Sequence, residues 1–102
     1  MQNYTTDYLL DKKICIFQPI DGYRASSDAV LISSLIDNIK SNESILDVGS
    51  GTGGISLCLA HRFRDNTIVG LELQSDLAEL SNLSAQQNSF TNLSYYNCDI
   101  KE

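Results

Sequence analysis

The chain has 102 residues, 42% hydrophobic and 20% charged, with six glycines and one proline, which is typical of one small globular domain and excludes a disordered, collagen-like or repeat protein. Seven basic and thirteen acidic residues give a net charge of −6, which argues against this stretch alone binding nucleic acid phosphates. Because no apolar run approaches about 18 residues and no secretory signal is visible, we expect a cytoplasmic protein without a membrane segment.

The first 40 residues are predicted to form a lead-in followed by a helix. Residues 1–27 combine short strands and a turn, with a strand over residues 14–17 and a turn over residues 19–22. A helix is predicted over residues 28–40, because Ser27 is a good capping residue and apolar residues follow at helical spacing.

Strands and helices alternate from residue 44 onward. The patterns predict strands over residues 44–48, 67–72 and 93–98, and helices over residues 54–64 and from Ser75, as the capping residue, to about Asn88. The first of these strands is apolar and is predicted to be a buried parallel strand. Right-handed crossovers place the three strands in one parallel sheet, so the fold class is α/β.

The helix at residues 54–64 is predicted to bury one face, formed by Ile55, Leu59 and Phe63. The helix after Ser75 is predicted to bury a stripe of small and aliphatic side chains, namely Leu77, Ala78, Leu80 and Leu83. Both helices therefore have an apolar side that can cover the sheet.

Residues 47–54, Asp-Val-Gly-Ser-Gly-Thr-Gly-Gly, lie between a predicted strand and a predicted helix. Glycines at this place let a ligand approach the backbone N–H groups at the start of the helix. The pattern fits two kinds of site. Gly49, Gly51 and Gly54 satisfy the G-x-G-x-x-G pattern of dinucleotide sites, whereas Asp47 with Gly49, Gly51 and Gly53 satisfies the D-x-G-x-G-x-G pattern of S-adenosylmethionine sites.

The charge of Asp47 favours the second kind of site. A dinucleotide would place a doubly negative pyrophosphate near this carboxylate, whereas S-adenosylmethionine carries a net charge of +1. At about 4 Å and an effective dielectric of about 20, the sign of a charge matters by roughly 4 kcal/mol before desolvation. We therefore predict an S-adenosylmethionine site in which Asp47, Ser50 and the glycine backbone take part.

Two further acids follow the second and third predicted strands. Glu72 ends the second strand, where a carboxylate can accept both ribose hydroxyls of a nucleoside. Asp99 follows the third strand and is predicted to accept the exocyclic amine of adenine, with Leu73 and Ile100 as apolar neighbours of the ring. Because the carboxyl ends of parallel strands form one crevice, these residues are expected to line a single site.

Cysteine and histidine do not predict a metal site. Cys15, Cys58 and Cys98 are far apart and form no C-x-x-C pair, and His61 is the single histidine. We expect buried, reduced thiols and a partly exposed helical histidine, with no metal.

These motifs resemble class I S-adenosylmethionine-dependent methyltransferases. Residues 47–54, 70–73 and 97–100 match the three cofactor motifs of that family. Residues 18–32 resemble the Q-P-x-x-G-Y-R-x-x-x-D-A-x-L-L lead-in of the bacterial tRNA(Val) adenine-N6 methyltransferases, although Ile32 stands where that family prefers leucine. Residues 28–102 would then be the first half of a Rossmann-like cofactor domain.

The resemblance implies roles for individual residues. The intact enzyme would transfer a methyl group from S-adenosylmethionine to the N6 amine of an adenine in tRNA. Asp47 and the loop would hold the methionine end, and Gln18, Tyr23 and Arg24 would close over its carboxylate.

That family also has an Asn-Pro-Pro-Tyr box after a fourth strand, and this box is missing from residues 1–102. We therefore expect an amino-terminal piece of a longer enzyme, with no catalytic residue of its own and no tRNA binding alone. We also expect self-association through the unpaired edge of the first parallel strand.

Other functions stay open at this point. The chain would also suit a fragment of an NAD-dependent oxidoreductase, or a non-catalytic half-domain that serves as an assembly partner. Within the methyltransferases, the acceptor is tRNA, rRNA, a protein glutamine or a small molecule.

Overall fold

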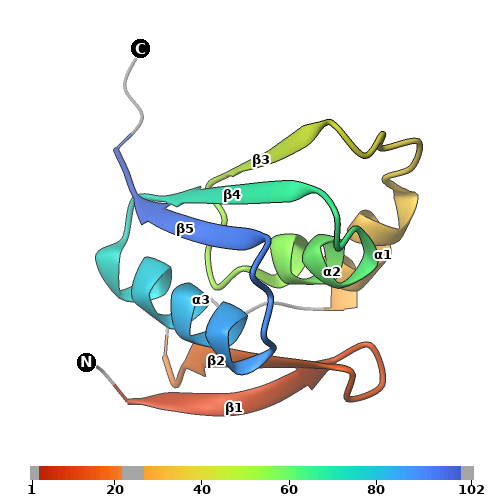
Figure 1. Cartoon of the computed structure of the whole chain (residues 1–102). Helices are drawn as coiled ribbons and strands as arrows, with labels where there is room; N and C mark the ends of the chain where they lie inside the picture. Colours follow the sequence, from red (N-terminus) through yellow and green to blue (C-terminus); the bar gives the residue numbers. More distant parts are fainter. Residues whose placement is uncertain (1–2, 22–26, 100–102) are drawn as a thin grey trace.

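A three-stranded sheet forms one layer of the molecule, and two helices and a β-hairpin lie beneath it (Figure 1). The computed structural model describes residues 3–21 and 27–99. Within these ranges no helix has the length and hydropathy of a membrane span. The elements are β1 (Tyr4–Leu9), β2 (Ile14–Pro19), α1 (Ser27–Leu35), β3 (Ser44–Val48), α2 (Gly54–Arg62), β4 (Thr67–Glu72), α3 (Ser75–Gln87) and β5 (Leu93–Asn97).

The sheet has the order β3-β4-β5, and both strand pairs are parallel. The register aligns Ile45 with Ile68 and Ile68 with Leu93. These three side chains form one row of the core, in which Ile68 and Leu93 are buried and Ile45 is half-buried. The prediction of a parallel α/β sheet is therefore confirmed.

The prediction that residues 44–48 form a buried strand was wrong, because the outer face of the sheet is open at β3, whereas the predicted unpaired edge of this strand is confirmed among the described residues. Leu46 and Val48 are 60% and 59% exposed, and Tyr96 on β5 is 58% exposed on the same face. Figure 1 shows α2, α3 and the hairpin on the other side of the sheet. Self-association through the β3 edge stays a prediction.

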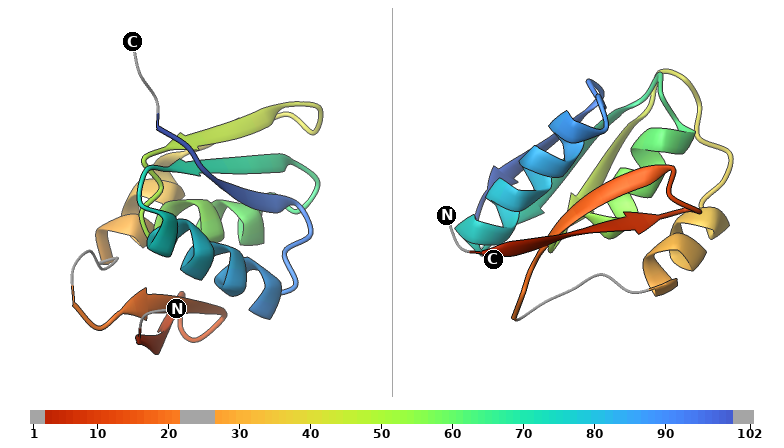
Figure 2. Two further views of the ribbon diagram at one scale, coloured as in Figure 1. Left: turned by 90° about the vertical axis from the view of Figure 1, so that its left-hand side faces the viewer. Right: turned by 90° about the horizontal axis from the view of Figure 1, so that it is seen from below.

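Helix α2 lies between the sheet and two other elements, so it is buried on more than one side (Figure 2). The predicted face of Ile55, Leu59 and Phe63 is only partly correct, since Ile55 and Phe63 are half-buried. The residues that α2 buries are Gly54, Ser56, Leu57, Cys58, Leu59 and Ala60. Helix α2 is packed against the sheet, α1 and β2, so it buries side chains on more than the one face that the sequence pattern predicts.

Helix α1 ends at Leu35, five residues before the predicted end at residue 40. The Nη1 atom of Arg62 donates to the carbonyls of Ser33, at 3.0 Å, and Ile36, which lie at this end of α1. Asn38, three residues after α1, has a φ of +59°, which is incompatible with the right-handed helix predicted to run to residue 40. The Arg62 guanidinium thus supplies donors for carbonyls at the C-terminus of α1, where helical N–H partners are missing. Helix α2 ends at Arg62, two residues before its predicted end.

The lead-in forms a hairpin in which β1 and β2 pair antiparallel. Ile14 and Ile16 of β2 are fully buried in the same core as α2 and β5. The turn predicted at residues 19–22 is partly correct, because Pro19 still belongs to β2 and Gly22 lies outside the described residues. The division of the chain into residues 1–27 and 28–102 stays a prediction.

Side chains of α3 hold the outer edge of β2. The Oδ1 atom of Asn88 accepts from the Cys15 N–H at 2.8 Å, and its Nδ2 atom donates to the Cys15 carbonyl at 2.6 Å. The Ser84 hydroxyl accepts from the Phe17 N–H at 2.8 Å. An amide side chain therefore serves as the partner that a further strand would supply.

Replacing Asn88 with alanine is expected to destabilise the chain by about 2 kcal/mol, because both backbone groups of Cys15 lose their partner. For a domain of this size, this loss lowers the melting temperature by about 10 °C. The control is Gln87→Ala, which changes an exposed residue of the same helix. Equal melting temperatures for the two variants would contradict the role of Asn88.

Candidate functional site

The glycine loop, residues 49–53, lies at the carboxyl end of β3 and leads into α2. Gly49, Gly51 and Gly53 have φ values of +72°, +60° and +90°, which favour glycine. The N–H groups of Gly49 and Ser50 both donate to the Leu71 carbonyl, at 2.8 and 3.0 Å. These two hydrogen bonds hold the glycine loop against the end of β4, so the carboxyl ends of β3 and β4 lie side by side, as predicted.

Glu72 at the end of β4 is buried beneath this loop. Its Oε1 atom accepts from the Gly51 N–H at 2.7 Å, and its Oε2 atom accepts from the Gln74 N–H at 2.8 Å. The prediction that Ser75 caps α3 was wrong, because the N-cap residue is Gln74 and Glu72 accepts its N–H. Each carboxylate oxygen keeps a lone pair for a further donor. The contact between Glu72 and a ribose stays a prediction.

Asp47 is half-buried near Glu72, on the face of β3 that looks toward α2. Burial raises the pKa of Asp47 above its ordinary value, and the neighbouring Glu72 raises it further, while a hydrogen bond from Ser56 lowers it. Two carboxylates thus lie close together under the loop. Such a pair favours a positively charged ligand group.

Replacing Asp47 with asparagine is expected to raise the melting temperature at pH 7. The pKa of Asp47 is higher in the folded chain, so its ionised form destabilises the fold above that pKa, and the effect disappears below the ordinary value of 3.8. Melting curves at pH 7 and near pH 3 measure the difference, with Asp65→Asn as the exposed control. A lower melting temperature of Asp47→Asn at pH 7 would contradict this prediction.

Tyr95 of β5 supports the loop from below. Its hydroxyl lies 2.6 Å from the Ser56 Oγ atom and donates to the Gly53 carbonyl at 3.3 Å. Burial strongly raises the pKa of Tyr95, so the phenol stays neutral. A Cβ atom at Gly53 or Gly70 would lie 2.4 Å from the nearest atom of Tyr95. Sequence reasoning missed this residue, although a glycine inside a central strand signals a close approach.

A cleft of 180 Å³ opens where the three strands end. Its walls contain the predicted residues Gly49, Leu73 and Asp99, together with Val48, Leu71 and Cys98, which sequence reasoning did not single out. This volume is below the range of about 300–1,000 Å³ that is usual for complete ligand sites. Within the described residues, the cleft is therefore too small to enclose a whole ligand of that size.

Two hydroxyls of the loop are buried without a partner. Within the described part of the chain, the Ser50 Oγ and Thr52 Oγ1 atoms have no hydrogen-bond partner. Ser50 is 7% exposed and Thr52 is fully buried. Buried hydroxyls without partners are uncommon in folded proteins, so these two atoms distinguish the glycine loop from the rest of the described chain.

Other predicted site residues lie away from this cleft or outside the described residues. Gln18 is buried in β2, where its Nε2 atom donates to the Asp7 carboxylate at 2.9 Å. Tyr23, Arg24 and Ile100 lie outside the residues that the structure describes. The predicted roles of these residues at the cofactor stay predictions. Cys58 is buried as expected, whereas Cys15 and Cys98 are half-buried.

Residues 39–102 match the family described as methyltransferase domain, which covers more than half of the chain. The chain belongs to the methyltransferase domain family. This methyltransferase domain has a Rossmann-like fold. The structure of TYW2 from P. horikoshii in complex with MeSAdo superposes with a TM-score of 0.77 at 17% identity, over 97% of this chain and 37% of that chain.

Curated relatives of the methyltransferase domain differ in what they are named for. The uncharacterised protein YbxB of Bacillus subtilis (strain 168) is 44% identical over 65% of this chain and 34% of that protein. A tRNA1(Val) (adenine(37)-N6)-methyltransferase of Flavobacteriaceae bacterium (strain 3519-10) is 30% identical over 88% of this chain and 39% of that enzyme. Others are named for 23S rRNA uracil and release factor glutamine methylation. The chain spans 22% to 39% of the length of the curated relatives it matches.

Proposed function

We propose that this methyltransferase domain binds S-adenosylmethionine at the carboxyl ends of β3, β4 and β5, as part of an enzyme that methylates RNA. One observation carries the cofactor proposal. The glycine loop and the carboxylates of Asp47, Glu72 and Asp99 lie at the same edge of the sheet. In sheets of this kind, ligands bind in the crevice at that edge.

The residues present fit the chemistry of the cofactor. Asp47 supplies negative charge for the ammonium and sulfonium groups, and the Glu72 carboxylate is placed at the end of β4 for the ribose hydroxyls. The apolar wall beside Asp99 suits the adenine ring. When bound, the cofactor supplies an activated methyl group. The residues of this chain bind and orient it, which is the main contribution expected in a methyl transfer.

RNA is the acceptor class that the relatives favour. The four matches that cover 87% to 93% of this chain are to enzymes named for 23S rRNA uracil or tRNA1(Val) adenine. The matches to release factor glutamine methyltransferases cover 64% and 69% of this chain. In its narrower form, the proposal is methylation of the N6 amine of an adenine in tRNA.

Calorimetry tests the cofactor proposal. We expect S-adenosylhomocysteine to bind the chain and NADH to give no heat of binding. Asp47→Asn is expected to weaken the binding of S-adenosylhomocysteine, because it removes a negative charge beside the ammonium group. The control is Asp65→Asn, which changes an exposed acid at the other end of the sheet and is expected to leave binding unchanged. Binding of NADH without S-adenosylhomocysteine would indicate an oxidoreductase, and binding of neither would favour an assembly partner.

The acceptor is tested separately, by tritium transfer from S-adenosylmethionine with the protein expressed from its gene. Unmodified tRNA, rRNA and release factor are offered in parallel. Incorporation into the adenine N6 position of tRNA supports the narrower proposal. Incorporation into release factor alone would overturn the RNA proposal.

A further inference from the structure

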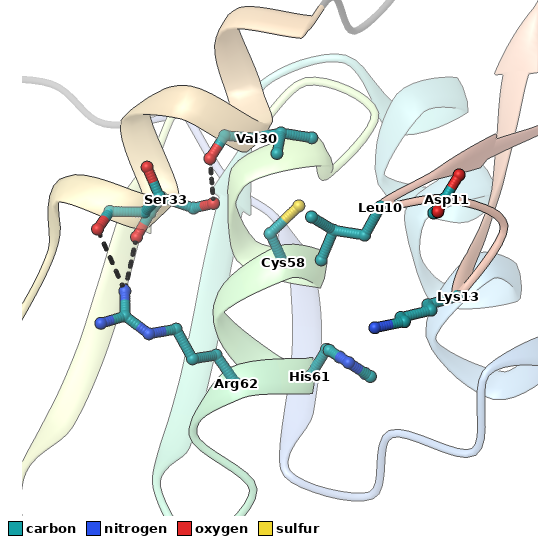
Figure 3. A pocket seen from close by; sticks show the side chains of 9 residues that line it. Leu10, Asp11, Lys13, Val30, Ser33, Cys58, His61 and Arg62 are labelled. Carbon is teal, nitrogen blue, oxygen red and sulfur yellow. Dashed lines mark hydrogen bonds between the residues drawn. The ribbon is translucent and has the colours of Figure 1, made fainter.

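A cavity of 560 Å³ lies between the turn of the hairpin, α1 and α2 (Figure 3). Its apolar floor is formed by Leu10, Val30 and Cys58. The glycine loop leads into the start of α2, whereas His61 and Arg62 of the cavity lie at its end. With a rise of about 1.5 Å per residue, Arg62 lies about 12 Å along the helix from Gly54 and Cys58 about 6 Å, and the residues that line this cavity are all different from those that line the cleft at the strand ends. The cavity is therefore separate from the proposed cofactor site, and its volume suits a small organic group.

Donor groups gather at the mouth of this cavity. Arg64, which can only donate, contacts the Nδ1 atom of His61 at 3.3 Å. In neutral His61 the Nδ1 atom must accept, so the Nε2 atom carries the proton and is a donor. Within the described residues, the Lys13 ammonium has no hydrogen bond or ion pair, and in Figure 3 it points toward His61.

The other charged groups that line the cavity do not bind Lys13 or His61, so these two donors are available to a ligand. The guanidinium of Arg62 is occupied by the end of α1 and by Asp37, at 3.8 Å. The carboxylate of Asp11 points away from His61 in Figure 3. A ligand with an anionic group and an apolar part therefore finds donors at the mouth and aliphatic side chains on the floor.

The positive charge of the described residues is concentrated at this end of the molecule. All five described basic residues lie in the hairpin turn or in the segments before β3 and β4, namely Lys12, Lys13, Lys40, Arg62 and Arg64. The acids in the same segments are Asp11, Asp37, Glu43 and Asp65. The cofactor edge, in contrast, holds Asp47, Glu72 and Asp99. These segments sum to a charge of +1, from five basic and four acidic residues, whereas the other described segments carry only acids, so a polyanion is repelled least at the end with the cavity.

We propose that this cavity binds one nucleotide unit of single-stranded RNA. Its phosphate lies between Lys13 and the Nε2 atom of His61, and its nucleoside rests on Leu10, Val30 and Cys58. The proposal rests on the proposed function, because it takes RNA as the acceptor class, and it replaces the expectation from the net charge of −6 that residues 1–102 alone do not bind tRNA. The contact holds the RNA at a distance from the cofactor edge, so Lys13 and His61 are positioning residues.

Fluorescence polarisation with a labelled single-stranded RNA of about ten nucleotides tests this site at about 50 mM salt. We expect Lys13→Gln and His61→Gln each to weaken RNA binding. For Lys13→Gln, the slope of log K against log salt concentration falls in magnitude by about one, as expected when one phosphate contact is lost. The matched control is Lys40→Gln, which removes the same charge at the same end but does not line the cavity.

A gain-of-binding variant keeps the test independent of misfolding. Asp11 lines the cavity and has a φ of +58°, a conformation that asparagine tolerates well. Asp11→Asn is expected to tighten RNA binding, because it removes a negative charge near the phosphate. A misfolded chain would not bind more tightly.

Three results would overturn the proposal. The first is that the unmodified chain does not bind RNA. The second is that Lys13→Gln and Lys40→Gln weaken RNA binding equally. The third is that inorganic phosphate displaces RNA when the two are compared at equal phosphate concentration. S-adenosylhomocysteine binding is measured on the same samples. Loss of cofactor binding in the unmodified chain contradicts the proposed function, whereas loss of RNA binding alone contradicts only the RNA site.

Discussion

Replacing Gly53 with alanine is expected to destabilise the chain by about 3 to 4 kcal/mol and to abolish cofactor binding. The new Cβ atom would lie 2.4 Å from the Tyr95 hydroxyl oxygen and 2.9 Å from the ring carbon Cζ. Overpacking of a buried site costs about 1 to 3 kcal/mol. The φ of +90° adds about 1 to 2 kcal/mol for a residue with a side chain. Thermal and urea denaturation measure the loss.

Gly49→Ala is the matched control for this substitution. Gly49 also has a positive φ, of +72°, but a Cβ atom there would meet nothing within 4 Å. We therefore expect only the backbone cost, about 1 kcal/mol. In the Gly53→Ala background, Tyr95→Phe removes the closest clashing atom and is expected to restore part of the stability. Equal losses at Gly49 and Gly53 would show that Tyr95 does not pack against the loop.

Glu72→Gln is expected to lower stability by about 2 kcal/mol and to abolish binding of S-adenosylhomocysteine. Both carboxylate oxygens accept from backbone N–H groups, of Gly51 and Gln74. A glutamine offers an N–H₂ group to one of these donors, so one charge-assisted hydrogen bond is lost and a buried N–H is left unpaired. The loop then loses the contact that fixes Gly51.

The control for this substitution is Glu79→Gln, which removes the same charge from an exposed position of α3. Its stability is expected to change by less than about 0.5 kcal/mol. Melting temperatures and calorimetric titrations of both variants measure the two effects. Stability and binding that are unchanged in Glu72→Gln would contradict the role of Glu72 under the loop.

The parallel sheet and the loop were predictable because their signals are local. The apolar runs at β3 and β4 end at a glycine cluster and at an acid, so their bounds can be read from neighbouring residues. Asp47, Gly49 and Glu72 follow from the same pattern, since strand ends of a parallel sheet meet at one edge.

The features that sequence reasoning missed depend on residues far apart in the chain. The end of α1 depends on Arg62, a residue of the next helix. The burial of Glu72 under the loop depends on its contact with Gly51, 21 positions away. Tyr95 reaches Gly53 across 42 positions. Such contacts arise only once the layers pack, so residue patterns along the chain do not reveal them.

The central claim is that an adenosyl cofactor binds at the carboxyl ends of β3, β4 and β5. Titration of ¹⁵N-labelled chain with S-adenosylhomocysteine, followed by NMR of the backbone amides, tests this claim most directly. We predict that the largest shifts fall on Gly49, Gly51 and Leu73, while amides around the far cavity, such as those of Lys13 and His61, stay in place. Shifts confined to the far cavity, or none at saturating ligand, would contradict the claim.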